Sequence, residues 1–331
     1  MVNSGGLRLS SRIESWPIAG SFAISRGSKT RAVVVVAELT DGRATGRGEC
    51  VPYARYGENP EAVLERIESL RGAIAAGLNR LDLQAALPPG AARNALDCAF
   101  WDFEAKAANE RVYELAGLPP PKPLVTAFTI SIGAPDEMAA AARAAAARPL
   151  LKIKLGNQGD PARIAAVRAA APKAELIVDA NEGWNAQNLA ENLAACASAG
   201  VTLVEQPLPD GGDDILSKIH RPLPVCADES AHDRASLAAL VGKYDAVNIQ
   251  LDKTGGLTEA LAMAAEAKRL GFSIMAGCMV STSLSMAPAH LVGQQARVID
   301  LDGPLLLAKD HEDGLRYDGS LVYPPEHSLW G

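Results

Sequence analysis

Six charged residues in the middle of the chain have the types and the spacing that metal-assisted proton transfer requires. Three are lysines and three are carboxylic acids, and each closes a short apolar run: Lys152, Lys154, Asp179, Glu205, Asp228 and Lys253. From Lys154 onward, the steps between them are 25, 26, 23 and 25 residues. Apolar runs at that interval, with helix-like stretches between them, predict successive strand–helix units of a parallel barrel. The carboxyl ends of such strands share one face, so we expect these side chains to converge there.

The three acids predict a metal site. Carboxylates gathered at one mouth repel one another unless a cation holds them together, and oxygen ligands favour a hard cation such as Mg²⁺. A single acid of this kind is more often a helix cap or a loop residue, but Asp179, Glu205 and Asp228 follow three successive predicted strands. We therefore expect them to bind one Mg²⁺ per subunit, with Asn181 and Glu229 as outer partners of the ligands.

The lysines predict proton transfer. Lys152 and Lys154 are two residues apart on a predicted strand, so both point to one side, and each lowers the pKa of the other. A solvated edge strand is the alternative, but the flanking leucines and isoleucine favour a buried strand. Lys253 closes the sixth predicted strand, across the mouth from Lys154. Two lysines so placed could remove and return a proton on opposite faces of a carbon; the alternative for Lys253 is a structural salt bridge.

A second acidic pair, Asp300 and Asp302, follows the eighth predicted strand. An acidic pair outside the metal cluster suits a cationic group, such as a substrate ammonium. The sequence Asp302-Gly303-Pro304 also fits a turn, and for Asp302 the two interpretations stay open.

The overall composition limits the possible partners. The chain has 331 residues, of which 32 are basic and 39 acidic, and its net charge is −7. There is no basic surplus for neutralising phosphates, so we expect no nucleic-acid partner. No apolar run approaches the roughly 18–20 residues of a membrane span, and no signal-peptide core is seen, so we expect no membrane partner. The five cysteines lack metal-ligand spacing and favour a reducing cytoplasm. Whether the chain forms a homo-oligomer stays open.

The chain changes character near residue 120. Residues 31–39 predict a strand and residues 60–108 predict helix, which together form an α+β unit. The prolines of segment 118–123 then mark a boundary. Eight strands follow, near residues 125–132, 150–155, 175–180, 202–206, 224–228, 246–251, 272–277 and 297–301, with helix-like segments in the first seven gaps. We expect a first domain over residues 1–122, a barrel over 123–305, and a tail over 306–331 that returns to the first domain.

These motifs resemble the enolase superfamily, in its muconate-lactonizing subgroup. The resemblance rests on the Lys152-Ile153-Lys154 motif, the series Asp179, Glu205 and Asp228, and Lys253 in DKTGG. It implies a modified TIM barrel, (β/α)7β, with an α+β N-terminal capping domain that the tail completes. It also implies a Lys or His base with Mg²⁺ stabilising an enediolate.

Further stretches, among them GECVPYARYGENP, GAARNALDCAFWD and DLDGP, resemble the dipeptide epimerases of that subgroup. This implies Mg²⁺-dependent epimerisation of an L-Ala-D/L-Glu dipeptide at the glutamate α-carbon, in murein peptide recycling. Lys154 and Lys253 would exchange the proton, and Lys152 would tune Lys154. Asp300 and Asp302 would bind the substrate ammonium, and Arg26 the side-chain carboxylate.

Other functions share most of these residues. An epimerase for another dipeptide, an N-acylamino acid racemase and an o-succinylbenzoate synthase would have the same metal ligands and lysines. Asp300 and Asp302 discriminate among them, because an N-acylated or aromatic acid substrate offers no ammonium. A non-catalytic binding barrel is a different class, and we would expect it to have lost a ligand or a base.

Overall fold

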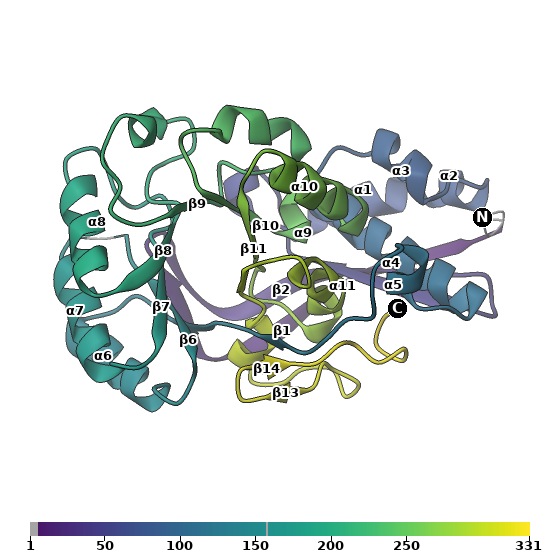
Figure 1. Cartoon of the computed structure of the whole chain (residues 1–331). Coiled ribbons are helices and arrows are strands. Elements are labelled where there is room, and N and C mark those ends of the chain that lie inside the picture. Colours follow the sequence, from purple (N-terminus) through teal and green to yellow (C-terminus); the bar gives the residue numbers. More distant parts are fainter. Residues whose placement is uncertain (1–5, 157) are drawn as a thin grey trace.

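The computed structural model describes residues 6–156 and 158–331. Its first unit contains an antiparallel sheet in the order β1-β2-β3, formed by β1 (Arg8–Ile24), β2 (Gly27–Thr40) and β3 (Thr45–Cys50). The predicted strand at residues 31–39 lies within β2. The tip of the β1–β2 hairpin reaches the barrel, where Arg26 donates to the carbonyl of Asn181. Figure 1 shows this hairpin in purple behind the ring of barrel strands.

The helical part of the first unit is divided into several helices. These are η1 (Ala54–Tyr56), α1 (Pro60–Ser69), α2 (Arg71–Ala75), α3 (Arg80–Ala86), α4 (Ala91–Ala108) and α5 (Val112–Leu115). The prediction that residues 60–108 are helical is therefore confirmed, with breaks at residues 76–79 and 87–90. Asn79 caps a new helix by accepting from the backbone of Leu81 and Asp82, and Pro88, Pro89 and Gly90 separate α3 from α4.

The second unit is the predicted parallel barrel. Its eight-stranded sheet runs in the order β12-β11-β10-β9-β8-β7-β6-β5. The strands are β5 (Phe128–Ile130), β6 (Leu150–Lys154), β7 (Glu175–Asp179), β8 (Val201–Glu205), β9 (Val225–Ala227), β10 (Ala246–Ile249), β11 (Ser273–Ala276) and β12 (Val298–Ile299). The two outer strands approach each other, because the amide of Ala127 donates to the carbonyl of Ile299 at 2.8 Å. The chain is thus a modified TIM barrel with an N-terminal α+β domain.

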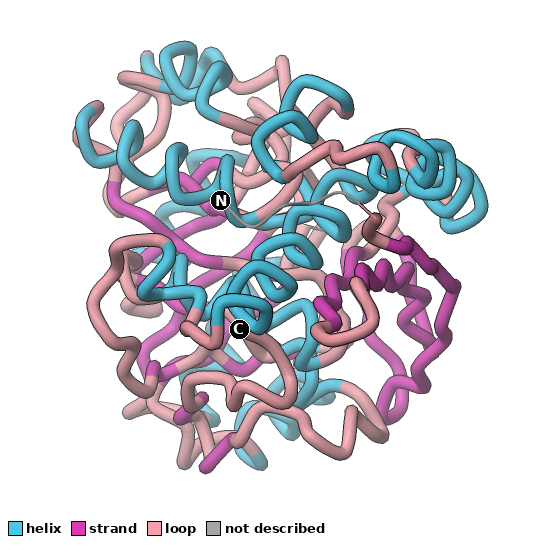
Figure 2. Tube along the Cα trace, turned by 90° about the vertical axis from the view of Figure 1, so that its right-hand side faces the viewer, coloured by secondary structure: helices cyan, strands magenta, loops and turns pink. Residues whose placement is uncertain are grey.

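Helices of the α type cover only part of the barrel (Figures 1 and 2). They are α6 (Pro135–Ala144), α7 (Asp160–Ala170), α8 (Leu189–Ser198), α9 (Leu251–Thr254), α10 (Leu257–Arg269) and α11 (Ser283–Gly293). The strand connections after β8 and β9 contain the 3₁₀ helices η2 (Asp214–Ser217) and η3 (Arg234–Leu240) instead. The helix-like segments predicted for these two gaps are thus 3₁₀ helices rather than α-helices. After β8, Pro207, Pro209 and the pair Gly211-Gly212 interrupt the backbone pattern that an α-helix needs.

The C-terminal segment returns to the first unit after η4 (Gly303–Leu306). Its strands β13 (Tyr317–Asp318) and β14 (Leu321–Val322) form a small antiparallel sheet with β4 (Leu124–Val125), so residues 124–125 belong to this sheet rather than to the first barrel strand. Trp330 donates to the carbonyl of Cys98 at 3.1 Å, and the amide of Gly331 donates to Asp102 at 2.6 Å. The exact division at residues 122 and 306 stays a prediction.

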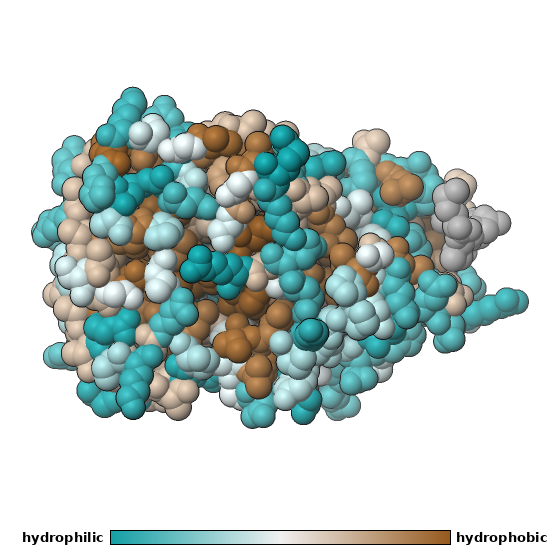
Figure 3. Space-filling view, viewed as in Figure 1, coloured by the Kyte–Doolittle hydropathy of each residue, from teal (hydrophilic) through white to brown (hydrophobic). Residues whose placement is uncertain are grey.

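The surface is mixed in character. Hydrophilic residues cover much of the face shown in Figure 3, and apolar residues show between them near its centre. None of the helices in the described part of the chain has the length and apolar character that crossing a bilayer requires.

Close packing of β3 on α4 joins the sheet and the helices of the first unit. A Cβ added to Gly48 would lie 2.1 Å from the carbonyl oxygen of Ala95 in α4. We expect Gly48→Ala to lower the free energy of unfolding by about 1–3 kcal/mol, since overpacking at a rigid backbone contact must displace the helix. Urea denaturation measures this. Gly72→Ala in α2 is the control, because its Cβ meets nothing within 4 Å. Equal losses in the two variants would contradict the prediction.

Candidate active site

The register of the barrel sheet brings the predicted metal ligands to one edge. Lys154 pairs with Asp179 across β6 and β7, and Asp179 pairs with Glu205 across β7 and β8. Glu205 pairs with Cys226 in β9, so Asp228 follows two residues later at the same end. The strand ends are buried, and none of these four charged residues is more than 8% exposed. The convergence predicted from the spacing is therefore present for these residues.

Lys152 is the centre of an ion-pair cluster. Its Nζ lies 2.7 Å from an oxygen of Glu205, 2.7 Å from an oxygen of Asp300 and 3.2 Å from an oxygen of Asp179. Lys154 donates to the same Asp179 oxygen at 2.6 Å. One ammonium thus connects carboxylates from β7, from β8 and from the end of β12.

The acids raise the pKa of both lysines. Burial opposes the charge of Lys152, but Asp300, Glu205 and Asp179 outweigh it and raise its pKa well above the ordinary value. Burial also opposes the charge of Lys154, and Asp179 reverses that effect. Lys152 does act to lower the pKa of Lys154, as the sequence predicts, but Asp179 outweighs this effect and the net direction in this arrangement is upward. A divalent cation among the acids would act in the lowering direction, which a general base needs.

The carboxylates differ in their affinity for protons. Burial, together with the charges of Asp179 and Asp228, raises the pKa of Glu205 to about 8. Burial also disfavours the charge of Asp179, but Lys154 and Lys152 hold its pKa below the ordinary range. Burial and the charge of Asp228 raise the pKa of Glu229 to about 7. Burial and the neighbouring acids therefore outweigh the nearby cations in setting the pKa of Glu205 and Glu229.

Lys253 lies beyond the strand that was predicted to end with it. Strand β10 ends at Ile249, and Lys253 is in the one-turn helix α9. Its Nζ forms an ion pair with the Asp228 carboxylate and donates to the carbonyl of Asn248 at 3.1 Å. The salt bridge considered for Lys253 is thus present. Strands β7, β8 and β9 separate β6 from β10, so Lys154 and Lys253 come from different sides of the barrel. Their action on opposite faces of a substrate stays a prediction.

Asn248 and Gln250 belong to the same cluster, although they were not predicted. Asn248 donates to Glu205 at 2.6 Å, and Gln250 donates to Asp228 at 2.8 Å. The sequence held a signal for them: two polar residues, two positions apart, interrupt the apolar strand AVNIQL. Each orients one of the predicted metal ligands.

The residues present fit a divalent cation. As they stand, no three His, Cys, Asp or Glu side chains among the described residues are grouped to hold a metal ion, because lysine ammonium groups contact the acids. Buried side-chain oxygens without a hydrogen bond remain on Asn181, Glu229, Asn248, Gln250 and Asp300. Among the predicted site residues, six carboxylates accompany four cationic side chains. That formal excess of two negative charges, presented by oxygen donors, matches Mg²⁺.

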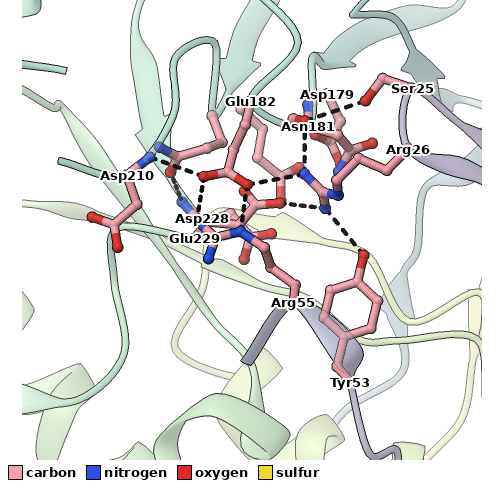
Figure 4. Close-up of polar contacts among 12 residues, drawn as sticks. Ser25, Arg26, Tyr53, Arg55, Asp179, Asn181, Glu182, Asp210, Asp228 and Glu229 are labelled. Carbon is pink, nitrogen blue, oxygen red and sulfur yellow. Dashed lines mark hydrogen bonds and ion pairs between the residues drawn. The ribbon is translucent and has the colours of Figure 1, made fainter. Parts of the chain in front are cut away.

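Arg26 connects the first unit to the mouth of the barrel (Figure 4). Its guanidinium donates to Glu229 at 2.7 Å, to Glu182 at 3.1 Å and to the Tyr53 hydroxyl at 3.0 Å. Arg55 donates to both carboxylate oxygens of Glu182 at 2.8 Å, and it shares Oε2 with Arg26. Sequence reasoning missed Tyr53, Arg55 and Glu182 because their contacts cross between distant loops. Arg26 and the outer partners Asn181 and Glu229 are thus in one network.

Asp300 and Asp302 lie in the same cavity as Arg26 and Lys154, which has a volume of about 630 Å³. Asp300 contacts Lys152, and Asp302 accepts from the amide of Thr129 at 2.6 Å. Burial and the charge of Asp300 raise the pKa of Asp302 to about 7. The cavity therefore holds an acidic pair, buried lysines and an arginine, a set of charges suited to a small zwitterion with an additional carboxylate.

The two units match two domain families. Residues 8–117 match the mandelate racemase / muconate lactonizing enzyme N-terminal domain, and residues 137–327 match the enolase C-terminal domain-like family. The chain belongs to the enolase superfamily. Within this superfamily it is 48% identical to the L-Ala-D/L-Glu epimerase of Escherichia coli (strain K12), over 92% of this chain and 95% of that protein. It is also 44% identical to an N-acetyl-D-glutamate racemase of a Pseudoalteromonas species, over 90% and 95%.

Solved structures of superfamily members agree with the fold. An enolase family member from Agrobacterium tumefaciens with homology to dipeptide epimerases, which has bound sodium and L-Ala-L-Glu, superposes with a TM-score of 0.97. It is 56% identical and covers 98% of this chain and 100% of its own. The dipeptide epimerase of Enterococcus faecalis V583, complexed with Mg and L-Leu-L-Tyr, has a TM-score of 0.89, 27% identity and coverage of 96% and 97%.

We expect Mg²⁺ to raise the thermal stability of the protein, and EDTA to remove the effect. A ligand present at 100 times its Kd stabilises the folded state by about 2.7 kcal/mol. Asp179→Asn should abolish most of this increment by removing a charged ligand. Asp213→Asn is the control, because Asp213 is a buried acid that contacts Lys243 and Tyr244 instead. Differential scanning calorimetry across a Mg²⁺ series measures the shifts. An undiminished shift in Asp179→Asn would contradict the assignment.

Proposed function

We propose that the protein is a Mg²⁺-dependent epimerase of L-Ala-D/L-Glu, which inverts the α-carbon of the glutamate residue. The observation that carries this proposal is the charge pattern of one cavity, where the pair Asp300 and Asp302, the lysines of β6 and Arg26 lie together. The 48% identity to the Escherichia coli enzyme supports the same substrate.

Each charge of the dipeptide has a counterpart in this cavity. Asp300 and Asp302 accept hydrogen bonds from the α-ammonium of the alanine residue. Arg26 binds the glutamate side-chain carboxylate with the planar fork that now contacts Glu229 and Glu182. Asp179, Glu205 and Asp228 hold Mg²⁺ near the α-carboxylate. When bound, Mg²⁺ supplies the positive charge that stabilises the enediolate form of that carboxylate.

Two lysines carry the proton. Lys154, neutral at the start of one direction, takes the α-proton from one face of the α-carbon, and Lys253 donates a proton to the other face. The reverse direction exchanges these roles, so that one lysine begins neutral and the other protonated. Lys152 remains charged next to the developing negative charge, and its contacts with Asp179, Glu205 and Asp300 keep it there. The burial of all three lysines excludes competing water.

Racemisation of an N-acylated glutamate is the second candidate. The 44% identity to the Pseudoalteromonas N-acetyl-D-glutamate racemase favours it. That substrate has no ammonium, so Asp300 and Asp302 would face a neutral amide at the cost of unpaired buried charge. The acidic pair therefore supports the dipeptide. A non-catalytic barrel is the less favoured alternative, since all predicted ligands and lysines are present.

A cytoplasmic role in murein peptide recycling completes the proposal. All five cysteines are free, and four of them are buried, as suits a reducing compartment. The partner is the small dipeptide alone, and the oligomeric state stays open.

Incubation in D₂O with Mg²⁺ tests the reaction class and the substrate together. We expect deuterium uptake at the glutamate α-carbon and inversion for L-Ala-L-Glu, both read by mass spectrometry and chiral analysis. N-acetyl-L-glutamate should react at least tenfold more slowly, because its acylated amino group has no positive charge to pair with Asp300 and Asp302. Preference for the N-acetylated acid would favour the second candidate, and no exchange with any member of an L-Ala-L-Xaa library would favour a binding protein.

Replacement of either exchanging lysine separates the two half-reactions. We expect Lys154→Ala and Lys253→Ala each to lower epimerisation by at least about 1,000-fold, while each variant still exchanges the α-proton of one epimer. The two variants should retain opposite epimers. Deuterium uptake into separately supplied L-Ala-L-Glu and L-Ala-D-Glu measures this. Near-normal epimerisation by Lys253→Ala would exclude the two-base mechanism.

Asp300→Asn should lower kcat/KM more for a substrate with a free ammonium group than for one whose amino group is acylated. Loss of one charged contact with an ammonium costs about 1.5–3 kcal/mol, or about 10–150-fold in kcat/KM for L-Ala-L-Glu. N-acetyl-L-glutamate should lose much less, so the ratio of the two kcat/KM values is the diagnostic quantity. Unchanged turnover of L-Ala-L-Glu would show that Asp300 does not bind the ammonium.

A further inference from the structure

The helix that carries Lys253 is too short to be stable alone. Helix α9 has four residues, and the amides of Gly255 and Gly256 both donate to the carbonyl of Leu251, its first residue. A single helical turn fixes several dihedral angles for very few hydrogen bonds, so contacts outside the turn must hold it. All four of its residues are buried. The orientation of Lys253 therefore depends on what packs against this turn.

The contacts that hold α9 come from helix α4 of the first unit. Asn94 donates its side-chain amide to Asp252 at 2.8 Å. Arg93 donates to the carbonyls of Thr254 at 2.7 Å and Gly255 at 3.1 Å, which caps the end of the turn. Asn94 and Asp252 are 0% and 6% exposed, so water does not compete for their hydrogen bond.

The glycines after α9 permit this approach. A Cβ on Gly255 would lie 2.5 Å from the Arg93 guanidinium, and a Cβ on Gly256 would lie 2.4 Å from the side chain of Asp97. Both glycines also have positive φ angles, of 75° and 111°, which other residues rarely adopt. The DKTGG motif thus serves to bring the backbone of the Lys253 turn against α4.

Asp252 and Lys253 are neighbours that point in different directions. Consecutive residues of a helix are about 100° apart around its axis. Asp252 points to α4 and to the amide of Val51, which donates to it at 2.9 Å. Lys253 points into the barrel, toward Asp228. Fixing Asp252 therefore fixes the rotation of the turn and the direction of Lys253.

We propose that Asn94 is a positioning residue for Lys253, acting through Asp252, so that the first unit sets the geometry of one of the two lysines that exchange the proton. The inference rests on the two-base function proposed above. It also predicts an asymmetry, because Lys154 lies on strand β6 and donates to Asp179 of β7, within the barrel itself.

This asymmetry is tested by measuring the rate of α-proton exchange separately for the two epimers. Lys253→Ala first identifies the epimer whose α-proton depends on Lys253. Asn94→Asp places two carboxylates against each other and should turn α9 away from Asp228. A displacement of about 1 Å costs about 100-fold in rate. We expect that loss for the Lys253-dependent epimer and less than about threefold for the other.

Further variants separate positioning from a general loss of structure. The quantity compared is the exchange rate of the Lys253-dependent epimer divided by that of the other epimer. Asp252→Asn should also lower this ratio. The double variant Asn94→Asp/Asp252→Asn again places a hydrogen-bond donor opposite an acceptor, so the ratio should rise again. Asp102→Asn is the matched control. Asp102 is a buried acid of the same helix, but it contacts Arg47, Lys106 and Gly331. Its variant should leave the ratio unchanged, even if stability falls.

The outcomes discriminate between the proposals. A lowered ratio in the single variants that rises in the double variant supports the positioning role. Equal slowing of both epimers in Asn94→Asp, or a double variant whose ratio stays at the single-variant value, overturns it and leaves the epimerase function intact. A wild-type protein that exchanges neither epimer removes the proposed function itself, and the inference with it.

Discussion

The concentration of negative charge at the buried strand ends is the constraint on which the rest of the site depends. Parallel strands in register place Asp179 and Glu205 side by side, and Asp228 follows on the next strand. In a medium of low polarity these charges are tolerated only with cations among them. Lysine ammonium groups fill that role here, and a divalent cation can take it over. The same constraint thus explains why lysines and metal ligands occur together, and why lysines released from their acids can act as bases.

The first unit is part of this charge system. The β1–β2 hairpin brings Arg26 to Glu229, whose burial otherwise leaves its charge uncompensated. Helix α4 approaches from another direction and contacts the turn after β10. The barrel alone would therefore have an open mouth and a poorly supported Lys253. This gives a physical reason why the two units form one enzyme, since each supplies contacts that the other cannot replace.

The sequence allowed the barrel and most of the charged cluster to be predicted, because strand-end residues recur at a regular interval. Lys253 shows the limit of that reasoning. Its spacing fits a strand end, but three residues of turn separate it from Ile249, and spacing alone does not distinguish the two. The pKa of Lys154 shows a related limit. The predicted lowering relied on Lys152, two residues away, and on a divalent cation, whereas Asp179 from the neighbouring strand raises this pKa in the present arrangement. Contacts between distant segments, such as Asn94 with Asp252, leave no periodic signal.

The electrostatics of the cavity also favour a substrate with three charges. Arg26 is held by Glu229 and Glu182, so a substrate carboxylate must compete with two acids for it. A neutral substrate side chain could not replace the ion pairs that Arg26 forms with these two acids, whereas a glutamate carboxylate could form an ion pair of the same kind. Asp300 is similarly engaged by Lys152, yet one of its oxygens has no hydrogen bond. That oxygen can accept from an ammonium without breaking the existing pair. The acidic end of the cavity is therefore available to a free amino group, and the proposed role of Arg26 is to favour an acid at the basic end.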